Sequence, residues 1–209
     1  GENAVIPFTE GNGDYTVVGY QQIQGDQYAA LYSEILTVEL ENDFLPFLYP
    51  NQYVNFSPDS EASKLALSIV SEDTTDVDAL KQIYNYVVNN LTYDYDKAET
   101  VETGYLPDVD ETLSTKTGIC FDYAALTTAM LRSCDIPCKL QIGYTGDIKH
   151  AWIDVYIRSK GWVTGAVSFN GDSWSLMDPT FDSSADSDDT EAIQDYIGNA
   201  DNYTVQFTR

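Results

Sequence analysis

Cys120 is a residue whose type and position could provide a nucleophile. It follows Gly118, which allows the chain to turn, and it begins a segment predicted to be a helix through Leu131. A thiol at a helix N-terminus faces unpaired backbone N–H groups and the positive end of the helix dipole, which both favour the thiolate. A thiolate can attack a carbonyl carbon. The alternative is that Cys120 is a buried small apolar residue, as many free cysteines are.

A histidine and an aspartate follow Cys120 along the chain, in the order nucleophile, base and orienting carboxylate. His150 is the only histidine and precedes a predicted strand, and Asp178 ends a later apolar run that starts at Trp174. A nucleophile, a base and an orienting carboxylate can be far apart in sequence, because the fold brings them together. We therefore predict that Cys120, His150 and Asp178 converge.

The residues around these three positions resemble the transglutaminase-like (papain-like fold) superfamily, in its bacterial secreted or cell-surface form. The resemblance is carried by residues 118–124 (GICFDYA), Gly143, residues 150–152 (HAW) and residues 174–180. Residues 86–94 are similar to the helix and tyrosine-bearing strand that precede the core in bacterial members. The resemblance implies a Cys-His-Asp triad at Cys120, His150 and Asp178. It leaves the substrate open, because the superfamily contains transamidases, peptidases, amidases and inactive members.

The sequence departs from the common bacterial pattern at two places near the expected cleft. Ile153 stands where asparagine often follows the His-Ala-Trp motif, and residues 164–172 form an insertion where a shorter turn is usual. Substrate preferences of the superfamily therefore do not carry over directly.

The expected activity is cysteine-dependent acyl transfer on peptide or amide bonds. Cys120 would form a thioester, His150 would move the proton, and Asp178 would orient the imidazole. Hydrolysis is favoured over transamidation, because no segment obviously shields the thioester from water. The backbone N–H of Cys120 is one expected oxyanion donor, and the second is sought at Tyr144 or between Tyr93 and Tyr105. The expected substrate contacts are Tyr123, Tyr144, Trp152 and Trp174. Core packing is the alternative for the two tryptophans, and a plain helix-start residue is the alternative for Tyr123.

A second hypothesis is a catalytically silent module on the cell surface that binds peptide or glycan. Inactive relatives usually lose a member of the triad, whereas this sequence retains all three. The enzyme hypothesis is therefore preferred.

The charge of the chain excludes some partners. Ten basic residues against 34 acidic ones give a net charge of −24, which repels nucleic acid and anionic lipid. A peptide, protein or cell-wall peptide meets no such repulsion. No apolar run is long enough to span a membrane. The composition favours a secreted or cell-surface protein. The first residues do not resemble a signal peptide, and we therefore expect any signal segment to have been removed.

The remaining cysteines and acidic residues do not predict a metal site or a cofactor. Cys134 and Cys138 flank Pro137 and are expected to be buried small residues rather than a disulfide. No CxxC pair or second histidine is present for zinc. The acidic residues 182–191 lack the glycine of an EF-hand loop and are interpreted as a solvated loop.

The elements that must position the site predict an α+β fold. Helices are expected after Ser57 and Thr75, and strands at residues 138–144, 151–158, 161–164, 173–178 and 203–208. Short connections between these strands favour an antiparallel sheet packed on the central helix that carries Cys120. Residues 104–113 are expected to be an ordered loop. His150 and Trp152 share one strand face, which we expect to face the helix.

The first part of the chain is expected to be an extension packed on this core. Residues 14–23 are predicted to be a strand, residues 31–40 either a strand or a short helix, and residues 44–50, with two prolines, an irregular segment. We divide the chain into an extension at residues 1–56 and a transglutaminase-like domain at residues 57–209.

Overall fold

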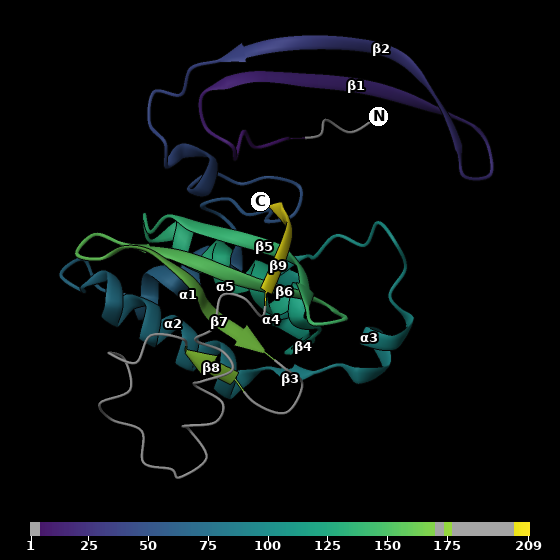
Figure 1. The fold of residues 1–209 in the computed structure, drawn as a ribbon. Helices are drawn as coiled ribbons and strands as arrows, with labels where there is room; N and C mark the ends of the chain where they lie inside the picture. The colour runs from purple at the N-terminus through teal and green to yellow at the C-terminus, as the bar shows by residue number, and fades with distance from the viewer. Residues whose placement is uncertain (1–4, 170–173, 177–202) are drawn as a thin grey trace.

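The computed structural model describes residues 5–169, 174–176 and 203–209, and its centre is one buried helix beside an antiparallel sheet (Figure 1). Asp178 and the acidic residues 182–191 lie outside the described residues. Within the described part, the sheet has the strand order β8-β7-β6-β5-β9. Its strands are β5 (Cys138–Thr145), β6 (Ile148–Ile157), β7 (Gly161–Phe169), β8 (Trp174–Leu176) and β9 (Tyr203–Thr208). Neighbouring strands are antiparallel throughout, as predicted.

The central helix α5 (Cys120–Ser133) begins at the predicted nucleophile and is buried from Asp122 to Arg132. Alanine and threonine occupy many of its positions, so neighbouring elements can approach its backbone closely. It contacts β5 and β6 of the sheet, and it also contacts α1 (Glu61–Ile69), α2 (Asp76–Asn90) and α4 (Val109–Thr115). The described helices are too short or too polar to cross a membrane.

Helix α2 forms as its sequence predicts. The Thr75 side chain accepts a hydrogen bond from the backbone N–H of Asp78, which caps the first turn. Leu80, Ile83 and Val87 recur at three- and four-residue spacing and are buried in the core.

The segment between α2 and α5 contains two helices that the sequence analysis missed. Asp94 caps α3 (Tyr95–Thr100) by accepting from Lys97 N–H, and Asp108 caps α4 by accepting from the N–H groups of Asp110 and Glu111. The expected loop at residues 104–113 is thus wrong from Val109 onward. Both helices are short and polar, so they show little apolar periodicity, and their capping aspartates were the only signal.

The side chains of β6 alternate between two faces as predicted, but the face expected to meet the helix is the wrong one. Ala151, Ile153 and Val155 belong to the apolar core that includes α5. His150 and Trp152 lie on the alternate face of the strand, where their rings stack on each other. The small and branched side chains are the ones that fit against the closely packed helix.

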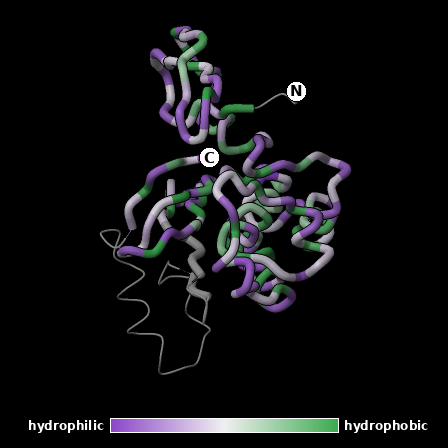
Figure 2. Tube along the Cα trace, turned by 90° about the vertical axis from the view of Figure 1, so that its right-hand side faces the viewer, coloured by the Kyte–Doolittle hydropathy of each residue, from purple (hydrophilic) through white to green (hydrophobic). Residues whose placement is uncertain are grey.

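The first part of the chain contains a hairpin that stands away from the body (Figures 1 and 2). Strands β1 (Gly13–Gln24) and β2 (Gln27–Val38) pair with each other, so the ambiguous second segment is a strand. Most of the hairpin is exposed, including Leu31 and Ile35. The division at residue 56 stays a prediction.

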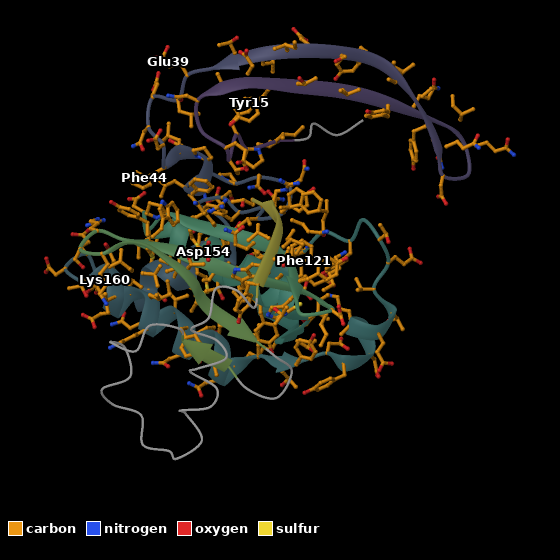
Figure 3. The ribbon with its side chains drawn as sticks, viewed as in Figure 1. Tyr15, Glu39, Phe44, Phe121, Asp154 and Lys160 are labelled. Atoms are coloured by element: carbon orange, nitrogen blue, oxygen red, sulfur yellow. The ribbon has the colours of Figure 1, made fainter. Side chains whose placement is uncertain are left out.

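Residues 44–56 make the contacts between this first part and the core. The 3₁₀-helix η1 (Leu45–Phe47) lies between the hairpin and the sheet, next to Phe44 (Figure 3). The ring of Phe44 is 4.4 Å from that of Tyr156, and the ring of Phe47 is 5.3 Å from that of Trp162. Val54 is fully buried.

Candidate active site

The sulfur of Cys120 lies where three donors converge. The backbone N–H groups of Ala151 and Phe121 and the hydroxyl of Tyr93 all hydrogen-bond to it. Ala151 directly follows His150, so the thiol lies beside the peptide that joins these two residues. Segments 30 residues apart in sequence therefore meet at the start of α5.

Tyr93 reaches Cys120 because a short parallel pairing fixes its strand. Strand β3 (Thr92–Tyr93) pairs with β4 (Thr117–Gly118) immediately before the helix. The N–H of Asp94 donates to the carbonyl of Gly118 at 2.9 Å. The Tyr93 hydroxyl hydrogen-bonds both the backbone N–H and the side chain of Cys120, while burial raises its pKa to about 12. The Tyr93–Tyr105 range considered for an oxyanion donor thus contains a residue that touches the nucleophile.

His150 is held as a buried neutral imidazole. Its ring stacks on the indole of Trp152, with centroids 6.2 Å apart and planes 16° apart. Burial lowers the pKa of His150 to about 4, so the ring is uncharged at neutral pH.

Burial also raises the pKa of the Cys120 thiol, and the three hydrogen bonds and the helix N-terminus do not reverse that shift. The sequence analysis expected the helix start to favour the thiolate and did not include this desolvation. Cys120 and His150 thus each favour the neutral form.

Gly143 allows the strands around His150 to approach closely. It pairs with His150 across β5 and β6. A Cβ at this position would lie 1.9 Å from the backbone oxygen of Thr204 in β9 and 3.1 Å from the Trp152 ring. Glycine is therefore required here by close approach, which explains its place in the motif.

Asp122, two residues after the nucleophile, is the centre of a buried polar cluster that the sequence analysis did not foresee. Its carboxylate accepts from the backbone N–H of Ile119 at 2.8 Å and from Lys97 Nζ at 2.7 Å, and it also accepts from the Tyr105 hydroxyl. A Cβ on Gly118 would lie 2.7 Å from the Asp122 Cβ. Gly118 is thus needed to admit Asp122, and its φ is not positive.

The predicted substrate residues have different environments. Tyr123 and Trp152 are each only 1% exposed, so both have packing roles, whereas Tyr144 is partly exposed. Trp174 begins β8. Their contact with substrate stays a prediction, as does the role of Asp178.

Cys134 and Cys138 are free thiols, of which Cys138 is buried as expected and Cys134 is only partly buried. Burial raises the pKa of Cys134 to about 11 and of Cys138 to about 12. Among the described residues, no group of three histidine, cysteine, aspartate or glutamate side chains is arranged to hold a metal ion.

Comparison with known proteins identifies relatives for the central part of the chain. Uncharacterized protein YebA of Bacillus subtilis is 24% identical in an alignment of 183 residues that covers 77% of this chain and 25% of that protein. UPF0252 protein MJ1282 of Methanocaldococcus jannaschii is 40% identical over 62 residues, which are 27% of this chain and 18% of that protein. The chain thus spans a quarter or less of the length of each.

Two solved structures are similar over 76% of the chain. One is described as a candidate cysteine protease from Cytophaga hutchinsonii, with 19% identity, a TM-score of 0.48 and 64% of that chain covered. The other is a candidate protease from Parabacteroides distasonis, with 14% identity, a TM-score of 0.43 and 38% covered. The family model of the transglutaminase-like superfamily matches residues 63–165, which include Cys120, His150 and Tyr93. This α+β region of the chain therefore belongs to the transglutaminase-like superfamily.

Proposed function

We propose that the chain catalyses cysteine-dependent acyl transfer on peptide or amide bonds, with Cys120 as the nucleophile and His150 as the base. One observation carries the proposal. The Cys120 sulfur, at the start of α5, is hydrogen-bonded to the Tyr93 hydroxyl and to the backbone N–H that follows His150. This arrangement supports a site in which Cys120 is the nucleophile, Tyr93 is a side-chain donor and the neighbouring His150 is the base.

The first half-reaction uses the neutral pair. Sγ of Cys120 attacks the carbonyl carbon while its proton passes to the uncharged imidazole of His150. The tetrahedral intermediate collapses, the C–N bond breaks, and the leaving amine takes that proton. A thioester remains on Cys120. Water then attacks the thioester with His150 accepting its proton, and the acid and the free thiol are released.

The intermediate needs two donors for its oxygen. The backbone N–H of Cys120 and the hydroxyl of Tyr93 face each other in the resting site, where the N–H donates to the hydroxyl oxygen. An incoming carbonyl oxygen would take over the N–H and receive the Tyr93 proton as a second hydrogen bond. Tyr93 is thus our candidate for the second donor.

Three finer points remain predictions from the sequence. Asp178 would hold the imidazole of His150 in one orientation. Water would be preferred to an amine as the acyl acceptor, and the protein would act outside the cell on a peptide or cell-wall peptide.

The test is turnover of a peptide and cell-wall fragment library in water, with and without excess primary amine. Cys120→Ala and His150→Gln should abolish turnover, whereas Cys134→Ser should retain it. Tyr93→Phe should lower kcat by about 10²–10³-fold with little change in KM, the loss typical of one oxyanion donor. Turnover that survives Cys120→Ala would refute the proposal, and tight peptide binding without product would instead favour the silent module. Accumulation of the amide product at the expense of the acid would reverse the preference for water.

A further inference from the structure

Lys97, Asp122 and Tyr105 form a cluster in which each side chain is hydrogen-bonded to the other two. Asp122 is fully buried, and the Lys97 side chain is 30% exposed. The Lys97 ammonium bonds both the Asp122 carboxylate and the Tyr105 hydroxyl at 2.7 Å, and the Tyr105 hydroxyl in turn donates to Asp122. Lys97 on α3 and Tyr105, eight residues later, thus meet a carboxylate of α5 two residues after the nucleophile.

A buried carboxylate at this position affects both the folding and the chemistry of the helix start. It satisfies the backbone N–H of Ile119, the residue immediately before Cys120. Its negative charge also disfavours a second negative charge nearby, and Asp122 is among the causes that raise the pKa of the Cys120 thiol. A cation beside Asp122 would offset this repulsion.

Lys97 is well placed to be that cation. It lies on α3, whose cap Asp94 follows Tyr93 directly and is hydrogen-bonded to Gly118. The ion pair therefore makes a second link between the Tyr93 segment and the start of α5. Burial opposes the Lys97 charge, but its hydrogen bonds to Asp122 and Tyr105 outweigh that and raise the pKa of the ammonium.

We propose that Lys97 is a positioning residue for Cys120, acting through Asp122. It holds the carboxylate against the start of the nucleophile helix and neutralises the negative charge that would otherwise lie beside the sulfur. The inference rests on the proposed function only in taking Cys120 as the nucleophile, since Lys97 touches neither the sulfur nor a substrate.

Other charged and titratable groups around Cys120 must be included in the expected behaviour. Tyr93 from β3 contacts the sulfur, His150 lies next to the Ala151 N–H on β6, and Asp122 and Tyr123 lie on α5 itself. Tyr95 lies beyond Tyr93, with ring centroids 4.9 Å apart. Burial raises the pKa values of Tyr93 and of Tyr123, so both are protonated at the pH 7 at which the variants are compared. A change at Lys97 or Asp122 therefore leaves the charges of Tyr93 and Tyr123 as they are.

The experiment measures the pH dependence of Cys120 alkylation by iodoacetamide in the full chain, with the modified peptide identified by mass spectrometry. Lys97→Met should slow alkylation at pH 7 by about tenfold, because it leaves Asp122 charged and uncompensated. Asp122→Asn should accelerate it by a similar factor, and the double variant should lie close to the wild type. Lys97→Arg should also stay close to the wild type. Lys64→Met, which breaks the exposed Lys64–Glu61 pair, is the matched control and should change nothing.

A purely structural role predicts a different pattern. If Lys97→Met and Asp122→Asn shift the reactivity in the same direction, or if neither shifts it, the proposal is wrong. If Lys97→Met fails to fold, the double variant is compared with Asp122→Asn instead. Asp122→Asn keeps the Lys97 ammonium without its carboxylate, so the double variant, which lacks both charges, must react more slowly. Carbon NMR of the Cys120 Cβ follows the same protonation if the thiol is too buried to alkylate. None of these measurements needs a substrate, so opposite shifts without any turnover would reject the proposed function and retain this inference.

Discussion

The burial of His150 should make this protein less stable in acid. The imidazole is 9% exposed, and burial lowers its pKa from 6.5 to about 4 in the folded chain. Between these two pH values the unfolded chain binds a proton that the folded chain does not. The free energy of unfolding therefore falls as the pH falls through this window, and it is unaffected by His150 above it.

The size of this loss follows from the shift. A difference of about 2.5 pKa units at about 1.4 kcal/mol per unit gives about 3.5 kcal/mol in total, of which about 3 kcal/mol is lost between pH 6.5 and pH 4. That is a large part of the 5–15 kcal/mol typical of a folded domain. The contribution of His150 is isolated by difference from a variant that lacks the imidazole.

The assay is urea unfolding of the wild type and of His150→Gln at several pH values from 7.5 to 4. The difference in the free energy of unfolding between the two proteins should be constant above pH 6.5. On acidification to pH 4, the wild type should lose about 3 kcal/mol more than His150→Gln. A flat difference would refute the buried neutral imidazole. A change in favour of the wild type would mean that the folded state holds a charged His150.

Two further variants test contacts that shape the same fold. Gly143→Ala should destabilise the chain by about 1–3 kcal/mol or more and loosen β9, because its Cβ would overlap the backbone of Thr204; an unchanged urea midpoint would contradict this. Arg132→Met should cost about 3 kcal/mol, because the buried guanidinium donates to the carbonyls of Cys138, Tyr49 and Arg209. The exposed Arg158→Met, which breaks a 3.6 Å pair with Asp76, should cost under about 1 kcal/mol, and equal losses at the two arginines would be inconsistent with this explanation.

The sequence predicted the elements whose local signals are strong. The helix from Cys120, the capped helix after Thr75 and the antiparallel strands all appear where propensity, capping and apolar spacing place them. The motif around Cys120 and His150 predicted which segments meet. These are short-range patterns, so a single sequence carries them.

What the sequence could not show depends on tertiary packing. The Lys97–Asp122 pair joins residues 25 apart, and no local pattern announces it. The apolar face of β6 meets α5, whereas the expected catalytic order had placed the His150 face there. The neutral state of His150 arises from desolvation, which only the folded structure creates.

The most direct test of the central claim is to trap the acyl-enzyme. The wild type is mixed with the peptide and cell-wall fragment library, quenched rapidly in acid, digested and weighed. The account predicts an acyl mass on the peptide that contains Cys120, reduced strongly in His150→Gln and absent from the peptides that contain Cys134 and Cys138. An acyl adduct on another cysteine, or one at Cys120 that forms equally fast without His150, would contradict it.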